Sequence, residues 1–400
     1  MAANPIITLY KTVKSITQPR QYSQPQLLRN IPGSNRQSWQ ALTTRKNQKG
    51  RLRATIIQID RETPDTVTLT FSIEQRGSFN YKAGQFVTCI FKDPTKADQP
   101  GRKNELKRAY SLSGDAQQGA LKITVKQISD GLVSTLINQS LSAGDHFEII
   151  GPSGNFVLPE QLDKHYLFIA GGVGITPIYS QITALLEEPA DKSITLLYAS
   201  HDEASIIYKN KLMALATKHQ NFHLHFYLSK KAIRKPQIAK NSLPVTWHPR
   251  LRSDDISAAM NVSGSQSPTV SLCGPDGLMS MVNETLNRIN HPPQKRLQER
   301  FLVATNRALS LPEKPQQILF KRSRRTLFSK PGQTILDAAL DAGLDLPHSC
   351  QMGGCGHCKT AVISGNVLLE EPNCLSDEEK SKHLTLACCA YASGPIEIDA

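Results

Sequence analysis

Three cysteines stand within nine positions of the stretch "HSCQMGGCGHCKT", and a fourth follows in "LTLACCAYA". Their spacing reads Cys350-x4-Cys355-x2-Cys358-x29-Cys388. Four thiolates at this spacing are typical of a plant-type [2Fe–2S] cluster, and the glycines between them would let backbone amides approach the sulfurs. A zinc ribbon would need a second Cys-x2-Cys pair, which the sequence lacks. The pattern therefore predicts an iron–sulfur cluster.

The segment around these cysteines predicts a small α+β domain over residues 318–400. Its stretch "FSKPGQTILDAALDAGLDLPHSC" reads as a strand, then an amphipathic helix from about Thr334, then the cysteine loop. The segment resembles the plant-type ferredoxins, which fold as a β-grasp. That family usually has a non-ligand at the position of Cys389, so we assign Cys388 as the fourth ligand. Three other candidates are expected not to be ligands: Cys374, His348 and His357.

Length and composition indicate further domains. The chain has 400 residues, enough for two or three domains of about 100–200 residues each. No run of about 18 apolar residues is present, so no membrane-spanning helix is expected. Eight cysteines are too few for a disulfide scaffold in a chain of this length. The net charge of +13 lies outside residues 318–400, and without a nucleic-acid-binding motif it favours phosphorylated ligands over nucleic acid.

Short alternating strands fill residues 51–158 and predict an antiparallel β-barrel. Four fragments there resemble the flavin domain of the ferredoxin-reductase superfamily. They are "YKAGQF", "RAYS", "VKQISDGLVS" and "GPSGNF", in the order of the family. The resemblance implies a bound FAD, although some relatives with this layout use FMN.

The family roles transfer to matching positions of this chain. Arg108 is expected to bind the flavin pyrophosphate, Tyr110 to lie against the isoalloxazine ring, and Ser111 to hydrogen-bond near the hydride-accepting nitrogen N5. Backbone amides and the hydroxyl around Val133 and Ser134 form an anion site at a helix N-terminus. The full set of expected flavin contacts is Arg108, Ala109, Tyr110, Ser111, Thr124, Val125, Lys126, Leu132, Val133 and Ser134.

Residues 159–295 alternate buried strands with helices, which predicts a parallel α/β domain. The turn "GGVGITP" and the later "LCGPDGL" together resemble the nicotinamide domain of the same superfamily. Glycines permit close approach of the backbone to a phosphate at the carboxyl edge of the sheet. In relatives the cysteine at the position of Cys273 lies beside the nicotinamide, so Cys273 and Ser111 are the expected catalytic residues. The expected nucleotide contacts are Gly171, Gly172, Gly174, Thr176, Ser200, His201, Ser229, Lys230, Cys273, Gly274 and Pro275.

The choice between NADPH and NADH depends on a few positions. Relatives often have an arginine after the "YAS" strand, whereas this chain has His201. Ser229 and Lys230 fall where NADPH-using relatives carry a serine and a basic residue for the 2′-phosphate. A solvated surface lysine is the alternative interpretation. The balance favours NADPH, with NADH as the alternative.

Two segments lie outside these three domains. Residues 1–50 carry eight Lys and Arg and no Asp or Glu. This N-terminal extension could be a membrane-interface or partner-binding helix, a targeting peptide, or a helix packed on the barrel. Residues 296–317 read as a basic linker with a proline-marked region at each end.

Together these features resemble the FAD–NAD(P)–ferredoxin reductases, which include reductases of oxygenases, fatty-acid desaturases and hybrid-cluster proteins. The resemblance implies that a hydride from NAD(P)H reduces the flavin, and that electrons then pass singly through the cluster to a redox acceptor protein. A desaturase or an oxygenase is the favoured acceptor. A soluble hybrid-cluster protein, or a sensor or carrier module without turnover, is the alternative. We expect a cytoplasmic protein with a possible peripheral membrane contact through residues 1–50.

Overall fold

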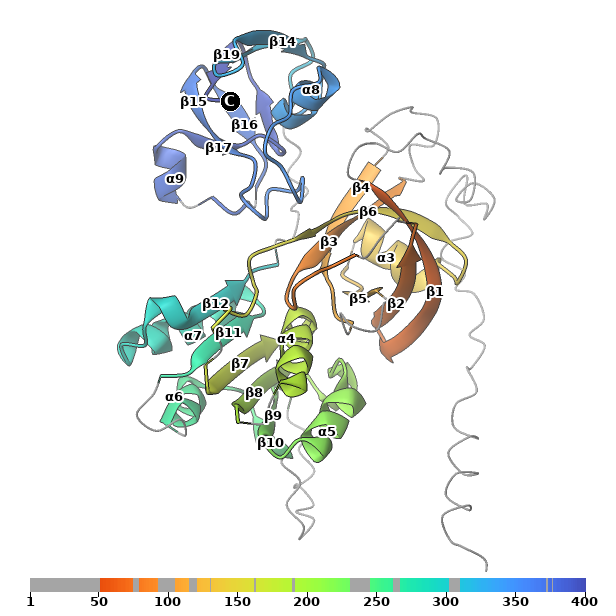
Figure 1. Ribbon diagram of the computed structural model, residues 1–400, viewed down its shortest axis with the longest axis vertical. Helices are drawn as coiled ribbons and strands as arrows, with labels where there is room; N and C mark the ends of the chain where they lie inside the picture. Colours follow the sequence, from red (N-terminus) through yellow and green to blue (C-terminus); the bar gives the residue numbers. More distant parts are fainter. Residues whose placement is uncertain are drawn as a thin grey trace, which may run out of the picture.

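The structure is a computed structural model. The residues that it describes are 51–74, 79–92, 105–114, 121–129, 131–161, 163–188, 191–230, 245–261, 267–301, 310–371, 373–375 and 377–400. Figure 1 shows three bodies along the chain: a barrel in orange and yellow, an α/β domain in green and teal, and a C-terminal domain in blue. The predictions made for residues 1–50 lie outside the described residues.

The first body is an antiparallel sheet in the strand order β4-β3-β6-β1-β2-β5. Its elements are β1 (Leu52–Thr63), β2 (Thr66–Ile73), β3 (Phe86–Lys92), β4 (Glu105–Ser111), β5 (Leu121–Lys126), α3 (Leu132–Gln139) and β6 (His146–Ser153). A bridge between Leu112, next to β4, and Ile123 on β5 brings the two edge strands together. Because that bridge closes the sheet on itself, the predicted barrel is confirmed. Helix α3 packs against it through Val133, Leu136 and Ile137.

The second body is a six-stranded parallel sheet in the order β10-β9-β8-β7-β11-β12. Its strands are β7 (His165–Gly171), β8 (Ser193–Ser200), β9 (Phe222–Leu228), β10 (Val245–Pro249), β11 (Thr269–Cys273) and β12 (Arg296–Glu299). Its helices are α4 (Ile175–Glu187), α5 (Lys209–Lys218), α6 (Ser253–Asn261) and α7 (Asp276–Arg288), with short 3-10 turns η4 (Gly172–Gly174), η5 (Glu203–Ser205) and η6 (Pro293–Lys295). Two separate apolar clusters bury the two faces, one under α4 and α5 and one under α6 and α7. The predicted α/β class is therefore confirmed.

The order of the parallel strands locates a ligand-binding crevice. From β7 the chain proceeds outward to β8, β9 and β10, and then returns to place β11 on the other side of β7. Ligands of open α/β sheets bind at the carboxyl ends of the strands where the order reverses. The turns after β7 and β11 are the two that carry "GGVGITP" and "CGPDG".

Strand β12 lies inside the segment 296–317 that the sequence predicted as a linker. It pairs in parallel with β11, with Cys273 opposite Glu299. The parallel sheet therefore extends four residues past the boundary predicted at residue 295. A four-residue strand is too short to show a periodicity, which is why the pattern analysis missed it.

The third body has a mixed sheet in the order β14-β13-β19-β15-β17, and a two-stranded sheet of β16 and β18. Its elements are β13 (Gln316–Phe320), β14 (Arg325–Ser329), α8 (Ile335–Asp341), β15 (Lys359–Ser364), β16 (Val367–Leu369), α9 (Asp377–Ser381), β17 (Leu384–Leu386), β18 (Ala390–Ala392) and β19 (Ile396–Ile398). Helix α8 begins after Thr334, whose side chain accepts a hydrogen bond from Asp337 N–H at 3.1 Å. The predicted helix start and α+β class are confirmed.

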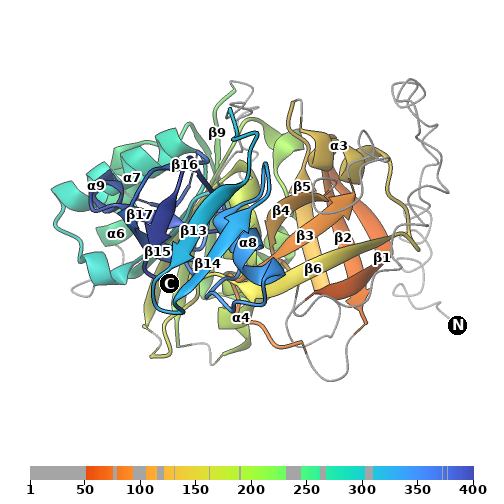
Figure 2. The ribbon, with the colours of Figure 1, turned by 90° about the horizontal axis from the view of Figure 1, so that it is seen from above.

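The C-terminal domain lies against the other two. In Figure 1 the blue domain stands above the barrel and the α/β domain, and Figure 2, from above, shows it over the seam between them. Hydrogen bonds join its cysteine loop to the barrel, among them one from Thr88 to Cys350 at 2.9 Å. Among the described residues, no helix is long and apolar enough to cross a membrane.

Candidate redox site

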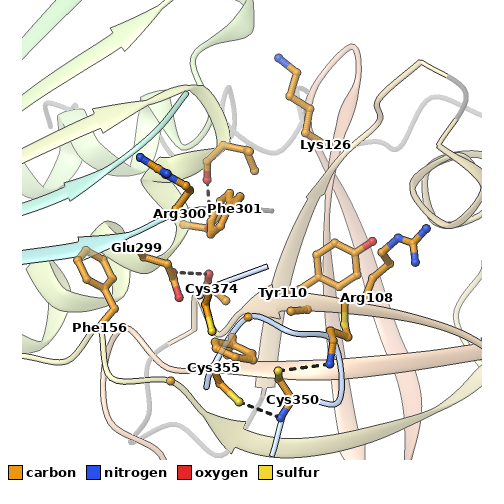
Figure 3. Close-up of a pocket in the computed structure, with 18 of the residues that line it drawn as sticks. Arg108, Tyr110, Lys126, Phe156, Glu299, Arg300, Phe301, Cys350, Cys355 and Cys374 are labelled. Carbon is orange, nitrogen blue, oxygen red and sulfur yellow. Dashed lines mark hydrogen bonds between the residues drawn. The ribbon is translucent and has the colours of Figure 1, made fainter. Parts of the chain in front are cut away.

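A cavity of about 1080 Å³ opens where the three domains meet. This volume is at the upper end of the roughly 300–1000 Å³ that cofactor and ligand pockets occupy. The barrel contributes Arg108, Tyr110 and Ser111, and the C-terminal domain contributes Cys350 and Cys355. Figure 3 shows the cysteines on the side of the cavity next to Tyr110. One cavity therefore joins residues that the sequence assigned to separate cofactors.

Strand β4 supplies the central wall of the cavity. Arg108, Ala109, Tyr110 and Ser111 all line it. Arg108 Nη1 donates to its neighbouring carbonyl, that of Lys107, at 2.7 Å, which holds the guanidinium close to the strand. Burial raises the pKa of the Tyr110 hydroxyl, so this ring stays neutral beside the cavity. The arrangement offers a cation and a flat aromatic face to a planar, phosphorylated ligand.

The N-terminus of α3 forms another part of the wall. Gly131, Leu132, Val133 and Ser134 line the cavity, and the Gly131 N-cap provides no side chain to cover the first amides. A Cβ at Gly131 would lie 2.4 Å from the Ser134 hydroxyl oxygen, so only glycine fits there. Unpaired amides at a helix N-terminus favour an anion. This is the chemistry that a pyrophosphate requires.

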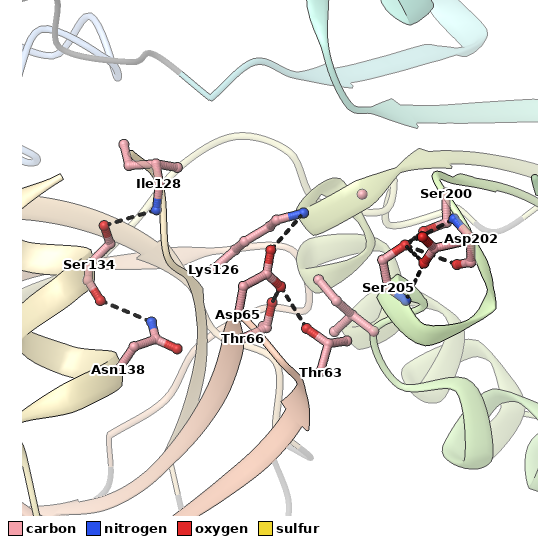
Figure 4. Close-up of polar contacts among 12 residues, drawn as sticks. Thr63, Asp65, Thr66, Lys126, Ile128, Ser134, Asn138, Ser200, Asp202 and Ser205 are labelled. Carbon is pink, nitrogen blue, oxygen red and sulfur yellow. Dashed lines mark hydrogen bonds and ion pairs between the residues drawn. The ribbon is translucent and has the colours of Figure 1, made fainter. Parts of the chain in front are cut away.

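Lys126 adds a cation on the same side. Its ammonium lies 3.4 Å from the carboxylate of Asp65. Figure 4 shows this pair facing the gap toward the carboxyl end of β8. Thr124, two residues earlier, also lines the cavity, whereas Val125 points into the barrel core and is 1% exposed. Of the predicted flavin contacts, Val125 could therefore act only through its backbone.

The two glycine turns of the α/β domain pack directly against each other. A Cβ at Gly174 would lie 2.3 Å from the carbonyl oxygen of Cys273, and one at Gly171 would lie 2.7 Å from Pro275. Larger residues would separate the turns, so these glycines are needed for the close packing of the β7 and β11 ends. Thr176, at the start of α4, lines the cavity. The predicted nucleotide loops thus meet at the strand-order reversal.

Cys273 and Ser111 approach each other through a residue that the sequence analysis missed. Ser111 Oγ donates to Glu299 Oε2 at 3.3 Å, and Glu299 stands opposite Cys273 in the β11–β12 pairing. Burial raises the pKa of the Glu299 carboxyl to about 8 and that of the fully buried Cys273 thiol well above its ordinary value. A neutral carboxyl at pH 7 therefore lies between the two expected catalytic residues.

Arg300 and Phe301 follow Glu299 and also line the cavity. Figure 3 shows all three side chains on the α/β side, across from Tyr110 and Arg108. No sequence signal pointed to them beyond the charged residues in "RLQERF", because pairing with β11, and not periodicity, makes this segment a strand.

The predicted 2′-phosphate contacts, Ser229 and Lys230, follow the carboxyl end of β9, next to the end of β8. Asp202 accepts from the backbone N–H of Ser205 at 3.1 Å and from its hydroxyl at 2.8 Å, which lowers the pKa of the Asp202 carboxyl. Its other oxygen lies 3.6 Å from Lys230 Nζ. Ser200 and Ser205 share a 3.1 Å hydroxyl contact, visible in Figure 4. The lysine expected to attract a phosphate therefore already has a carboxylate beside it.

The cysteine loop carries three of the predicted cluster ligands and contacts the fourth, Cys388, which follows β17. Three backbone N–H groups point at their sulfurs: Cys350 N to Cys355 Sγ at 3.4 Å, Met352 N to Cys350 Sγ at 3.4 Å, and Gly353 N to Cys388 Sγ at 3.2 Å. The Cys350 thiol and the backbone N–H groups of Cys350 and His357 lower the pKa of Cys355 to about 5, whereas hydrogen bonds with neighbouring thiols and burial raise the pKa values of Cys350, Cys358 and Cys388. Grouped cysteine sulfurs with amide donors are the environment that an iron–sulfur cluster uses.

The neighbouring cysteines and histidine that were predicted not to be ligands lie outside this group of sulfurs and amides. Cys389 is 3% exposed, and a Cβ at Gly353 would lie 2.9 Å from its sulfur, so it packs behind the loop. Cys374 is exposed at the cavity rim. His348 Nδ1 lies 2.7 Å from the Leu346 carbonyl, which occupies that ring nitrogen. The assignment of these residues as non-ligands stays a prediction.

Sequence profiles match the chain in three successive parts. An oxidoreductase FAD-binding domain matches residues 53–158, an oxidoreductase NAD-binding domain matches 168–284, and a 2Fe-2S iron-sulfur cluster binding domain matches 319–393. The chain belongs to the FAD–NAD(P)–ferredoxin reductases. The residues around the cavity fit the three groups, since cation, helix amides, aromatic face and thiolates are all present. This reductase uses FAD, NAD(P)H and a [2Fe–2S] cluster.

Curated relatives cover almost the whole reductase. The glycine betaine monooxygenase reductase subunit of Pseudomonas aeruginosa is 27% identical over 90% of this chain and 98% of that protein. The ferredoxin reductase component of the 3-ketosteroid-9-alpha-monooxygenase of Rhodococcus rhodochrous is 28% identical over 84% of this chain and 93% of that protein. These coverages show that the similarity to both relatives extends over all three domains.

A solved structure has the same architecture. Phthalate dioxygenase reductase matches with a TM-score of 0.61 and 24% identity, over 88% of this chain and 98% of that one. The likeness supports the fold. Proteins of this family are NAD(P)H oxidoreductases. They pass electrons through flavin and cluster to a redox acceptor protein.

Proposed function

We propose that this reductase is the electron-supplying component of an oxygenase system. The names of its relatives support the proposal, since they are reductase components of monooxygenases. The observation that carries it is the shared cavity, because its wall holds expected flavin contacts and two of the predicted cluster cysteines at once. Such a wall places a two-electron acceptor next to a one-electron carrier, as the supply of single electrons to an oxygenase requires.

The barrel residues would hold the FAD. Arg108 and the α3 amides near Val133 would bind its pyrophosphate, and Tyr110 would lie against its ring system. Ser111 would contact the ring near N5. When bound, FAD supplies the chemistry that accepts a hydride and releases electrons one at a time. These roles remain proposals that rest on the position of each residue around the cavity.

Glu299 and Cys273 would shape the place where the nicotinamide meets the flavin. The neutral carboxyl of Glu299 can hold a proton beside Ser111 Oγ, 3.3 Å away. The thiol of Cys273 is buried at the carboxyl end of β11, outside the cavity lining, and would add no charge near the nicotinamide. Phe301 would cover the ring from the α/β side.

The nucleotide that the charges favour is NADH. The sequence favoured NADPH because of Ser229 and Lys230. Asp202 now stands beside Lys230, and a 2′-phosphate there would meet an ionised carboxylate. An acidic residue at this end of the second strand commonly binds the ribose 2′-hydroxyl of NADH. We therefore propose a preference for NADH.

An anaerobic titration tests the proposal. The purified holoprotein is mixed with NADH or NADPH, and the visible flavin and cluster bands are followed before a purified oxygenase component is added. We expect both bands to bleach, faster with NADH, and to recover when the oxidised oxygenase is added. Reduction of the reductase without transfer to an oxygenase would favour a hybrid-cluster or other acceptor. A flavin that never bleaches would contradict the reductase function.

A further inference from the structure

Three consecutive residues of the cluster loop each contact a different strand of the flavin barrel. The pairs are Ser349 with Ser153 on β6, Cys350 with Thr88 on β3, and Gln351 with Lys107 on β4. The strands β4, β3 and β6 are neighbours in the sheet, in that order. The loop therefore crosses three adjacent strands with one polar contact on each. We call these three contacts the loop clamp.

The central contact of the loop clamp is fully buried. Thr88 is 0% exposed and Cys350 is 1% exposed. The Thr88 hydroxyl donates to the backbone carbonyl of Cys350 at 2.9 Å. A buried carbonyl that loses its donor keeps its desolvation cost without a compensating hydrogen bond. Since Cys350 is a predicted cluster ligand, this hydrogen bond attaches the cluster site itself to the barrel.

The clamp shares one face of the sheet with part of the cavity wall. Lys107, Ala109 and Ser111 alternate along β4, so their side chains share one face. Thr88 on β3 stands directly opposite Ala109 in the β3–β4 pairing. Ala109 and Ser111 line the cavity, while Lys107 and Thr88 hold the loop. One strand thus touches both the expected flavin and the cluster ligands.

The other two contacts fix the loop on either side. Lys107 Nζ donates to Gln351 Oε1 at 2.9 Å, and the hydroxyls of Ser153 and Ser349 are hydrogen-bonded. Gln351 has a positive φ of 55°, a conformation that costs energy in any residue but glycine. Gln351 has this conformation at the point where the loop contacts the barrel. We therefore assign the conformation of the loop to the state in which the C-terminal domain is docked on the barrel.

We propose that Thr88 is a positioning residue for electron transfer between flavin and cluster. Its hydroxyl, supported by Ser153 and Lys107, docks the cluster loop on the barrel and keeps the two redox groups at a fixed separation. The inference rests on the proposed function. The step that it serves moves one electron from the reduced flavin to the oxidised cluster, and no bond to Thr88 forms or breaks.

The test compares T88V and the double variant T88V/S153A with the wild-type holoprotein. Valine keeps the shape of threonine but cannot donate to the Cys350 carbonyl. T385V is the matched control, because Thr385 is 1% exposed in the C-terminal domain that carries Cys350, and its hydroxyl has no hydrogen-bond partner among the described residues. Iron and flavin contents are measured for every variant, so that loss of a cofactor is recognised.

Anaerobic stopped-flow mixing with NADH resolves flavin reduction from cluster reduction. For T88V we expect unchanged flavin reduction and cluster reduction that is about three- to tenfold slower, since a buried hydrogen bond contributes about 0.5–1.5 kcal/mol. The double variant should be slower still, and T385V should match the wild type. Cluster reduction at the wild-type rate in both T88V and T88V/S153A would overturn the proposal.

Small-angle X-ray scattering gives a readout that needs no turnover. Loss of the clamp should increase the radius of gyration of the double variant, because the C-terminal domain leaves the barrel more often. An unchanged radius together with unchanged cluster reduction would refute the docking role. Failure of NADH to bleach the wild-type flavin would instead refute the proposed function, so the two failures are distinguishable.

Discussion

Glu299 offers a quantitative check on the site. Its carboxyl has an ordinary pKa of 4.5 in the unfolded chain, and burial raises the folded value to about 8. Below pH 4.5 both states are protonated and the residue costs nothing. As the pH rises toward 8, the unfolded chain loses this proton and the folded chain keeps it, so folding is penalised by about 1.36 kcal/mol for each pH unit.

The substitution E299Q removes this penalty and keeps the shape. At pH 7 the variant should be more stable by about 2–3 kcal/mol, after allowance for water in the open cavity. Thermal unfolding of flavin-free protein at several values between pH 5 and pH 8 measures the difference. The gain in melting temperature should grow with pH, at about 2–4 °C per kcal/mol for a unit of 150–250 residues.

The pH dependence decides whether the reasoning holds. E160Q is the control, because the Glu160 side chain is 94% exposed and its loss should change stability equally little at every pH. A stability difference for E299Q that is constant between pH 5 and pH 8 would show that Glu299 ionises as it does in water. The neutral carboxyl beside Ser111 would then be refuted.

Four further substitutions test other parts of the molecule. D202N should raise kcat/KM for NADPH about fivefold in steady-state assays, since a charge pair at 4 Å in water is worth about 1 kcal/mol. An unchanged kcat/KM would show that Asp202 does not influence the choice between NADH and NADPH. Y208F should lower stability to denaturant by about 1–2 kcal/mol, because it deletes a buried hydrogen bond to Thr124 across the barrel–α/β interface; an unchanged midpoint would contradict this. C388S should abolish the iron–sulfur absorbance and C389S should retain it, and the reverse result would exchange the ligand assignment.

Local sequence patterns were sufficient to predict the architecture of the three domains. Alternating strands in residues 51–158 and strand–helix alternation after residue 159 predicted the barrel and the parallel sheet, because one period decides which face of an element is buried. The helix start at Thr334 was readable from its capping side chain. The cysteine spacing likewise indicated the cluster, since all ligands but Cys388 lie in one loop.

Contacts between residues far apart along the chain were not readable in this way. Asp202 lies beside Lys230 only because β8 and β9 are parallel neighbours that end at the same edge. The sequence therefore favoured NADPH, whereas our proposal of NADH rests on a carboxylate that lies far from Lys230 along the chain. Tyr208, with a positive φ of 59°, reaches a barrel threonine that no periodicity connects to it.

The sequence by itself determined which chemistries this protein contains: a flavin barrel, a nicotinamide sheet and a four-cysteine cluster site, each coded by residues close together in the chain. The tertiary structure decided how they are joined. Glu299 became part of the flavin cavity because β12 pairs with β11, and Thr88 became the support of Cys350 because the C-terminal domain docks on β3. Such contacts depend on the packing of whole domains, and the physical reason they escape a local pattern is that their partners are far apart along the chain.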